Sequence, residues 1–341
     1  MTLWIIAGVA LLVLVAALAY LKWRRDDDDG WQRPRYEWDR PTNPDVLASI
    51  PPPAGLAPPT TFSQEADSIA LESQELWIED DEPTGPIPKI LLRAAGRSDP
   101  GRKRKHNEDA FLLAPEHELY VVADGMGGYA AGEVASALAV ETLAEAFADN
   151  EFGPLDEGMP RRGAELVAAI RLANARIRRE ALSDQRKAGM GTTVVAARFA
   201  PGKKRVYVAH VGDSRCYRLR DGELERLTHD HTLGALGIRG PSAAKLSRAV
   251  GAFDEVEVDL RVDEPRVGDH YVLCSDGLYK AVDDDAIRRA IEAAAAPEDA
   301  VDALVREANA RGARDNVSVI VVRVDDPAVD VRESGEHRIS G

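Results

Sequence analysis

The sequence has few cysteines, no excess of basic residues and no internal repeat. Cys216 and Cys274 are the two cysteines in 341 residues, which is too few for a disulfide scaffold and fits a reducing compartment. The formal net charge of −15 argues against broad nucleic-acid binding, because that activity needs a basic face that neutralises phosphates. With 45% hydrophobic and 30% charged residues, part of the chain is nevertheless able to fold around a core.

Charged side chains are also absent from the first part of the chain. Leu3 to Leu21 is an uninterrupted run of 19 apolar or small residues, and as a helix it spans about 28 Å, enough to cross a bilayer core. The basic residues that follow it favour a cytoplasmic location for the rest of the chain. We therefore predict a single-pass transmembrane anchor over residues 1–21 in the cell membrane. A cleaved signal peptide is the alternative, although no basic residues precede the run.

Residues 22–88 lack a sustained hydrophobic period. They carry 6 Lys/Arg against 15 Asp/Glu, a net charge of −9, and residues 26–88 hold 11 of the 20 prolines. Charge repulsion and proline favour extended backbone, so we predict a disordered acidic linker. A docking role for its Thr or Pro sites is the alternative. A folded domain is expected over residues 89–325 and a flexible tail over 326–341.

Hydrophobic patterning predicts both strands and helices in the folded domain. Strands are expected over 110–113, 119–123, 192–199, 205–211, 216–220, 223–227, 269–274 and 317–324, and helices over 133–149, 166–182, 285–295 and 297–311. Asp221-Gly222 is a hairpin signal. Because strands come in runs joined by turns, with helices paired between the runs, the pattern indicates an α+β layered fold with antiparallel sheets.

Five aspartates lie at the ends of predicted strands or in glycine-containing turns, namely Asp109, Asp124, Asp213, Asp276 and Asp315. Carboxylates that follow neighbouring strands are held rigidly at a sheet edge and together form an oxygen-rich pocket. Hard divalent cations such as Mg²⁺ and Mn²⁺ bind that ligand set. Asp-Gly pairs also simply form turns, but five in this placement favour the metal pocket.

Six short motifs occur in a fixed order around these aspartates. They are Ser98-Asp99-Pro100-Gly101 with Arg104 to Asp109, Ala123 to Gly128, Gly189 to Thr193, Val211 to Arg215, Ser275 to Leu278, and Arg314 to Ser318. In this order and spacing they resemble the PPM-type (protein phosphatase 2C-like) metal-dependent Ser/Thr protein phosphatases of the bacterial branch. The resemblance extends from about Ile90 to Val324.

This resemblance implies a fold and a metal centre. The fold would be a four-layer α-β-β-α sandwich of two antiparallel sheets flanked by helix pairs. Two Mn²⁺ or Mg²⁺ ions would be bridged by Asp124, with the Gly125 carbonyl as a further ligand and Asp109 on one ion. Asp276 and Asp315 would complete the other ion.

The resemblance also implies the chemistry and its partners. Two metals clamp the attacking and leaving oxygens and lower the pKa of bound water from about 16 towards 7, so a metal-bridging hydroxide would hydrolyse phosphoserine and phosphothreonine in proteins. Arg104 would bind the substrate phosphate and, with Asp109 and Asp124, form the catalytic set. Asp213 would help Asp276 to hold a weaker third metal. The expected partners are phosphorylated proteins, in particular Ser/Thr kinases and their substrates, with a monomeric catalytic domain and no nucleic acid.

Three other functions stay open from the sequence. One is a phosphatase that acts on a phosphorylated sigma-factor regulator. Another is a weakly active scaffold that binds phosphoproteins at the membrane, and the third is a plain divalent-ion-binding module. The full aspartate set and Arg104 favour the enzyme, since neither a scaffold nor an ion-binding module has a chemical need for all of them.

Two features depart from the family pattern. Met126 stands where eukaryotic relatives carry histidine, so metal-bound water is expected to protonate the leaving group. The segment Leu233 to Leu246 is shorter than the flap that bacterial relatives place over the site. His229 and His231 are expected to pack or hydrogen-bond locally.

Overall fold

A computed structural model describes residues 90–127, 131–200, 202 and 204–327. The predicted anchor over 1–21 and the linker over 22–88 lie outside these residues, as does the tail beyond residue 327. Within the described part of the chain, no helix combines the length and the apolar character needed to cross a membrane.

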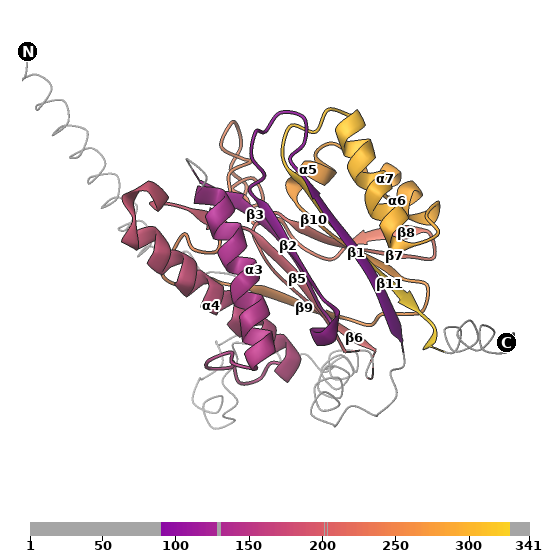
Figure 1. Cartoon of the computed structure of the whole chain (residues 1–341), viewed down its shortest axis with the longest axis horizontal. Helices are drawn as coiled ribbons and strands as arrows, with labels where there is room; N and C mark the ends of the chain where they lie inside the picture. The colour runs from indigo at the N-terminus through magenta and orange to yellow at the C-terminus, as the bar shows by residue number, and fades with distance from the viewer. Residues whose placement is uncertain (1–89, 128–130, 201, 203, 328–341) are drawn as a thin grey trace, which may run out of the picture. The chain divides into compact units, whose positions relative to one another are not determined.

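Eleven strands form two antiparallel sheets within the described residues (Figure 1). The first sheet has the order β1-β11-β10-β7-β8, with β1 Leu91–Asp99, β11 Val317–Asp325, β10 His270–Cys274, β7 Arg215–Arg220 and β8 Glu223–Arg226. The second has the order β2-β3-β5-β6-β9, with β2 Asp109–Ala114, β3 Leu119–Met126, β5 Val194–Ala200, β6 Arg205–Val211 and β9 Asp259–Asp263; the short β4 Gly191–Thr192 pairs with β3. Neighbouring strands run antiparallel throughout.

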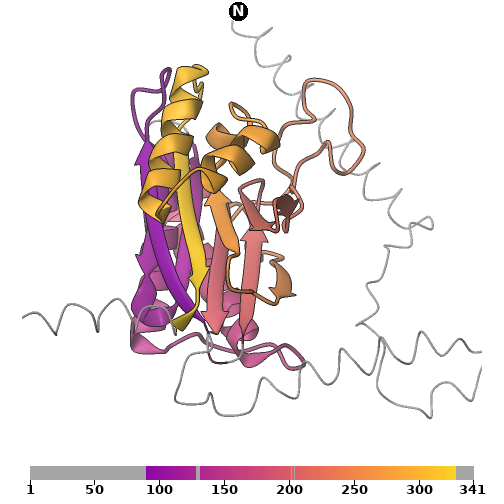
Figure 2. The same cartoon turned by 90° about the vertical axis from the view of Figure 1, so that its right-hand side faces the viewer.

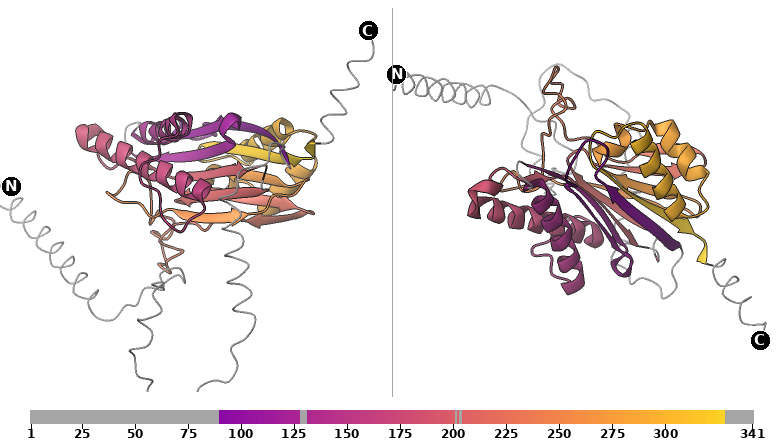
Figure 3. Two further views of the ribbon diagram at one scale, coloured as in Figure 1. Left: turned by 90° about the horizontal axis from the view of Figure 1, so that it is seen from below. Right: turned by 45° about the horizontal axis from the view of Figure 1, so that its top comes forward.

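Helices cover the outer face of each sheet. The helices α3 Ala131–Asp149 and α4 Arg161–Ser183 lie on one side, and α5 Asp276–Tyr279, α6 Asp284–Glu292 and α7 Pro297–Ala310 lie on the other (Figure 3). The 3₁₀ turns η4 Pro115–His117 and η5 Gln185–Lys187 complete the elements. The Asp283 side chain caps α6 by accepting a hydrogen bond of 2.9 Å from the Ala286 amide.

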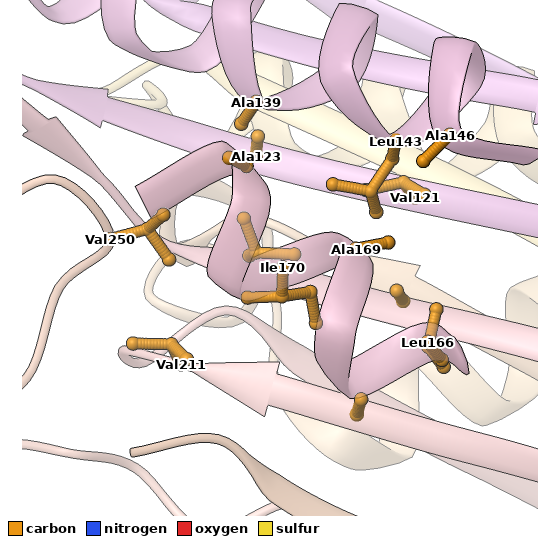
Figure 4. Close-up of a cluster of buried hydrophobic side chains, with 14 of the residues drawn as sticks. Val121, Ala123, Ala139, Leu143, Ala146, Leu166, Ala169, Ile170, Val211 and Val250 are labelled. Carbon is orange, nitrogen blue, oxygen red and sulfur yellow. The ribbon is translucent and has the colours of Figure 1, made fainter. Parts of the chain in front are cut away.

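Three hydrophobic clusters fill the spaces between successive layers. One joins α3 and α4 to the second sheet, where Leu143 of α3 and Ile170 of α4 pack towards Val121 of β3 (Figure 4). A second joins α5, α6 and α7 to the first sheet, and a third fills the space between the sheets with residues such as Tyr271 and Phe199. Three cores between successive layers give the four-layer α-β-β-α sandwich, whose first sheet and α7 face the viewer in Figure 2.

The layered α+β fold predicted from the sequence is therefore confirmed, together with its main elements. Five elements were not predicted: the strands β1 and β9, the single turn α5, and the 3₁₀ turns η4 and η5. β1 contains Gly96, and its apolar and polar residues alternate poorly. β9 places charged residues along a sheet edge. Neither strand therefore shows the alternation of apolar and polar residues that identifies a strand in a sequence. The strand expected over 192–199 is divided between β4 and β5. The predicted Asp221-Gly222 hairpin joins β7 to β8, with φ of 50° and 79° at its two residues.

Candidate metal and phosphate site

The antiparallel order of the strands brings the five aspartates to one end of the two sheets. Asp109 begins β2 and lies directly opposite Asp124 of β3 in the strand register. Asp213 follows β6, Asp276 follows β10, and Asp315 precedes β11. Because these strands alternate in direction, the start of one element meets the end of its neighbour, as the predicted pocket requires.

Four of these aspartates line a pocket of about 300 Å³. Its lining includes Arg104, Glu108, Asp124, Gly125, Met126, Gly127, Thr193, Asp213, Ala244, Leu246, Asp276, Lys280 and Asp315. Asp109 is not in this lining. Its Oδ2 accepts hydrogen bonds from the Ser275 and Ser318 hydroxyls at 2.8 and 2.7 Å, so its carboxylate lies behind the pocket wall between β10 and β11.

Burial and mutual repulsion disfavour negative charge on these carboxyls. Burial raises the pKa of Asp124 well above its usual range, and the charges of Asp109, Asp276, Asp213 and Asp315 raise it further. Burial likewise raises the pKa of Asp109 to about 6, against the lowering effect of its two serine hydrogen bonds. Burial and the charge of Asp276 raise the pKa of Asp213. Such a cluster is stable as carboxylates only if positive charge is supplied.

The site fits divalent metal ions. Asp109 Oδ1 and Asp276 Oδ1 are buried and have no hydrogen-bond partner among the described residues, and a buried carboxylate oxygen without a partner is costly. Hard cations prefer such oxygens as ligands. Gly125 also lies in the wall, where a Cβ atom would come 2.1 Å from the Gly132 carbonyl oxygen, so the backbone here admits no side chain.

Two threonines that the sequence analysis did not single out hold Asp124 in place. The Asp124 amide donates to Thr193 Oγ1 at 3.0 Å, and its carbonyl accepts from Thr192 Oγ1 at 2.9 Å. The Thr193 hydroxyl in turn hydrogen-bonds the Ser214 hydroxyl at 2.7 Å. Both threonines belong to one of the six motifs, and Ser275 and Ser318 belong to two others. Their presence in these motifs is the sequence feature that could have identified all four as part of the site.

Arg104 extends into the pocket from the loop between β1 and β2. Its Nη2 donates to Asp315 Oδ2 at 2.9 Å, while half of its side chain remains exposed. Asn316 fixes this loop, because its Nδ2 donates to the carbonyls of Pro100 and His106 at 3.1 and 2.9 Å and its Oδ1 accepts from the Glu108 amide at 2.9 Å. The arginine is thus held beside the acidic cluster, where a bound phosphate would meet its planar fork.

The histidines pack locally, as predicted. His231 Nδ1 accepts from the Gly212 amide at 3.2 Å, its ring stacks on His210, and its Nε2 lies 3.2 Å from Asp259 Oδ2. The ligand atoms of His210, His231 and Asp259 lie within 4.8 Å of one another. However, Arg248 donates to Asp259 at 2.7 Å, so this carboxylate already has a cationic partner.

One cysteine and the segment Leu233 to Leu246 have clear places in the structure. Cys274 is fully buried in β10, and burial raises the pKa of its thiol to about 12, so it is not a nucleophile at neutral pH. The short flap closes on itself through the Thr232–Leu246 bridge, and its Ala244 and Leu246 line the pocket. This segment therefore forms part of the site.

A four-layer sandwich with a carboxylate-lined pocket at one end of its sheets is the architecture of the metal-dependent phosphatases that the motif order resembles. The family model "Protein phosphatase 2C" matches residues 101–314. The serine/threonine protein phosphatase PstP of Mycobacterium tuberculosis is 40% identical over 250 residues, which are 70% of this chain and 46% of that protein. The serine/threonine phosphatase stp of Listeria welshimeri is 35% identical over 68% of this chain and 95% of its own length.

A solved structure gives the same result. The catalytic domain of PstP in complex with two manganese ions matches with a TM-score of 0.61 and 40% identity, over 70% of this chain and all of that domain. This chain therefore belongs to the protein phosphatase 2C family. Its match covers less than half of the full PstP protein.

Proposed function

We propose that this chain is a metal-dependent protein-serine/threonine phosphatase. The observation that carries the proposal is the buried aspartate cluster with two unpartnered oxygens beside Arg104. When two Mn²⁺ or Mg²⁺ ions are bound, they supply an activated water and neutralise charge on the phosphate. The related PstP catalytic domain binds two manganese ions, which supports the same occupancy here.

The chain's own residues provide ligands, orientation and phosphate binding. Asp124 would contact both ions, the Gly125 carbonyl would be a further ligand, Asp109 would hold one ion, and Asp276 and Asp315 would hold the other. Arg104, which donates a hydrogen bond to Asp315 in this structure, would bind the substrate phosphate through its planar fork. Asp213, next to Asp276, would contribute to a third and weaker site.

A phosphothreonine peptide tests this proposal directly. We expect the purified chain to release phosphate in the presence of Mn²⁺ and to lose this activity when the metal is removed by a chelator, with recovery on adding Mn²⁺ back. Turnover that persists without any divalent ion would contradict the proposal. Phosphopeptide binding without metal-dependent turnover would instead favour the weakly active scaffold, and Mn²⁺ binding without either would favour the plain ion-binding module.

We further propose that the enzyme is tethered to the cell membrane by residues 1–21, with its catalytic domain cytoplasmic and opposing Ser/Thr protein kinases. The 19-residue apolar run and the basic residues after it support the tether. Relatives such as PstP are named as serine/threonine protein phosphatases, which supports the Ser/Thr substrate class. Phosphoproteomics of cells that carry Asp124→Ala should show phosphorylation rising on kinases and their substrates, whereas a rise confined to a sigma-factor regulator would favour that alternative.

A further inference from the structure

Lys280 contributes a cation to the aspartate pocket that no sequence motif indicated. It lies one helical turn after Asp276, at the C-terminal end of α5, and its Nζ donates a hydrogen bond to Asp276 Oδ2. The neighbouring Tyr279 hydroxyl donates to Asp213 Oδ2 at 3.2 Å. Adjacent residues of α5 therefore bind the two carboxylates that a third metal would need.

Arg215 contacts the last residue of α5. The Arg215 guanidinium lies 3.5 Å from the centre of the Tyr279 ring. Arg215 is itself held by Asp230, with hydrogen bonds of 2.9 and 2.7 Å to its two carboxylate oxygens. This stack keeps the Tyr279 hydroxyl directed at Asp213, because a guanidinium packs favourably on an aromatic face.

The two oxygens of Asp276 have different surroundings. Oδ2 accepts from Lys280, whereas Oδ1 is buried and has no partner among the described residues. A divalent ion of the two-metal core therefore finds Oδ1 available without disturbing the lysine. A third ion between Asp276 and Asp213 has to compete for oxygens that Lys280 and Tyr279 already engage.

The charge balance of the pocket points the same way. The pocket and its wall hold five aspartates and Glu108 together with Arg104 and Lys280. Two divalent ions and these two basic side chains would bring six positive charges against six negative ones, so without the charge of Lys280 the pocket would keep a net negative charge. A lysine carries a positive charge at neutral pH. That charge is concentrated on the ammonium group, much as the charge of a metal ion is concentrated on the ion.

We infer that Lys280 takes the place of a third divalent cation at Asp276 and Asp213. This inference rests on the proposed function and concerns its metal requirement. The Lys280 side chain is half-exposed, with 52% of its surface accessible, so an ion at high concentration is able to displace it. The chain therefore works with two tightly bound ions, and a third binds weakly because it must first displace the ammonium group.

Manganese titration of the metal-free full chain tests the inference, with free Mn²⁺ followed by its electron paramagnetic resonance signal. We expect two tight sites in the wild type and in Lys280→Gln, and a third site at least tenfold tighter in Lys280→Gln than in the wild type. Lys280→Arg, which keeps the charge, should behave as the wild type. Lys187→Gln is the matched control, because Lys187 also pairs with a carboxylate, that of Glu180, but outside the pocket lining.

Adding Asp213→Asn to Lys280→Gln should remove the tightened third site and leave the two tight sites. Equal third-site affinity in wild type and Lys280→Gln would overturn the inference, and so would a tightened site that survives Asp213→Asn. If Lys280→Gln does not fold, Lys280→Met, which keeps the aliphatic stem, takes its place. Absence of the two tight sites in the wild type would instead overturn the proposed metal-dependent function.

Discussion

The aspartates form a pocket because each lies at the end of a strand or just beyond it. Asp109 and Asp124 face each other across β2 and β3, and hydroxyls of Ser275 and Ser318 hold the first of them. The sequence predicted the acidic pocket because carboxylates and glycines mark it within short motifs. It did not predict Lys280, because that contact exists only once a single turn of helix follows Asp276.

Arg104 is expected to act through its planar fork as well as its charge. Arg104→Lys should lower kcat/KM for a phosphopeptide by about 10- to 100-fold, since a charge-assisted hydrogen bond contributes about 1.5–3 kcal/mol. Steady-state kinetics would measure this loss. Arg102→Lys, an exposed residue of the same loop, is the control and should stay near wild type. An Arg104→Lys enzyme of unchanged kcat/KM would remove Arg104 from phosphate binding.

The raised pKa of Asp109, about 6, predicts how metal binding depends on pH. As the pH falls through this pKa, the folded protein binds a proton that competes with the cation, so Mn²⁺ affinity should be weaker at pH 5 than at pH 7. In the metal-free protein, the contribution of Asp109 to stability changes with pH in the opposite direction. The folded carboxyl takes up its proton at higher pH than the unfolded one, so this group favours folding more at pH 5 than at pH 7.

Titrations with Mn²⁺ and thermal melts of the metal-free chain at these two pH values would measure both effects. Asp109→Asn should reduce the pH dependence and leave the part that comes from Asp124, whose pKa is also raised by burial. Equal Mn²⁺ affinity at pH 5 and pH 7 in the wild type would show that Asp109 does not titrate in this range.

At the scale of elements, tight backbone contacts bring the separate parts of the site together. α5 packs so closely on the turn before β11 that a Cβ atom on Gly277 would lie 2.0 Å from the Asn316 carbonyl oxygen. This contact joins the residue after Asp276 to the residue after Asp315. Alternating patterns predicted most strands, but a four-residue helix has no period to detect, and edge strands such as β9 need no apolar face.

Gly277→Ala should therefore separate α5 from β11. We expect about 1–3 kcal/mol lower stability, as overpacking usually costs, together with weaker Mn²⁺ binding. Chemical denaturation and metal titration would measure the two effects. Gly163→Ala in α4 is the matched control, because its added Cβ meets the movable Leu260 Cδ2 at 2.7 Å rather than backbone. Gly277→Ala with wild-type metal affinity would contradict this role for the contact.

For the whole molecule, the distribution of charge separates the linker from the domain. Of the net charge of −15, residues 22–88 carry −9, and five aspartates of the remaining chain line the pocket or support it. The layered architecture was predictable because each sheet face and helix face has its own hydrophobic pattern. The strand order within each sheet was not, since it depends on contacts such as β1 with β11 that join distant parts of the chain.

The N-terminal run gives a prediction for location. The full chain should remain in the membrane fraction after carbonate washing, and a chain lacking residues 1–21 should be released while keeping its phosphopeptide turnover. Fractionation with mass spectrometry of the N-terminus would measure this. A mature protein that begins near Tyr20 and washes off would favour a cleaved signal peptide.

The most direct test of the metal-dependent mechanism is the phosphopeptide turnover and Mn²⁺ content of Asp124→Ala beside the wild type. Asp124 would contact both ions, so the variant should lose tight Mn²⁺ binding and essentially all turnover while remaining folded. Asp285→Ala, which removes an exposed carboxylate on α6, should keep both properties. An Asp124→Ala protein that hydrolyses the peptide at the wild-type rate would contradict a metal-dependent phosphatase centred on this pocket.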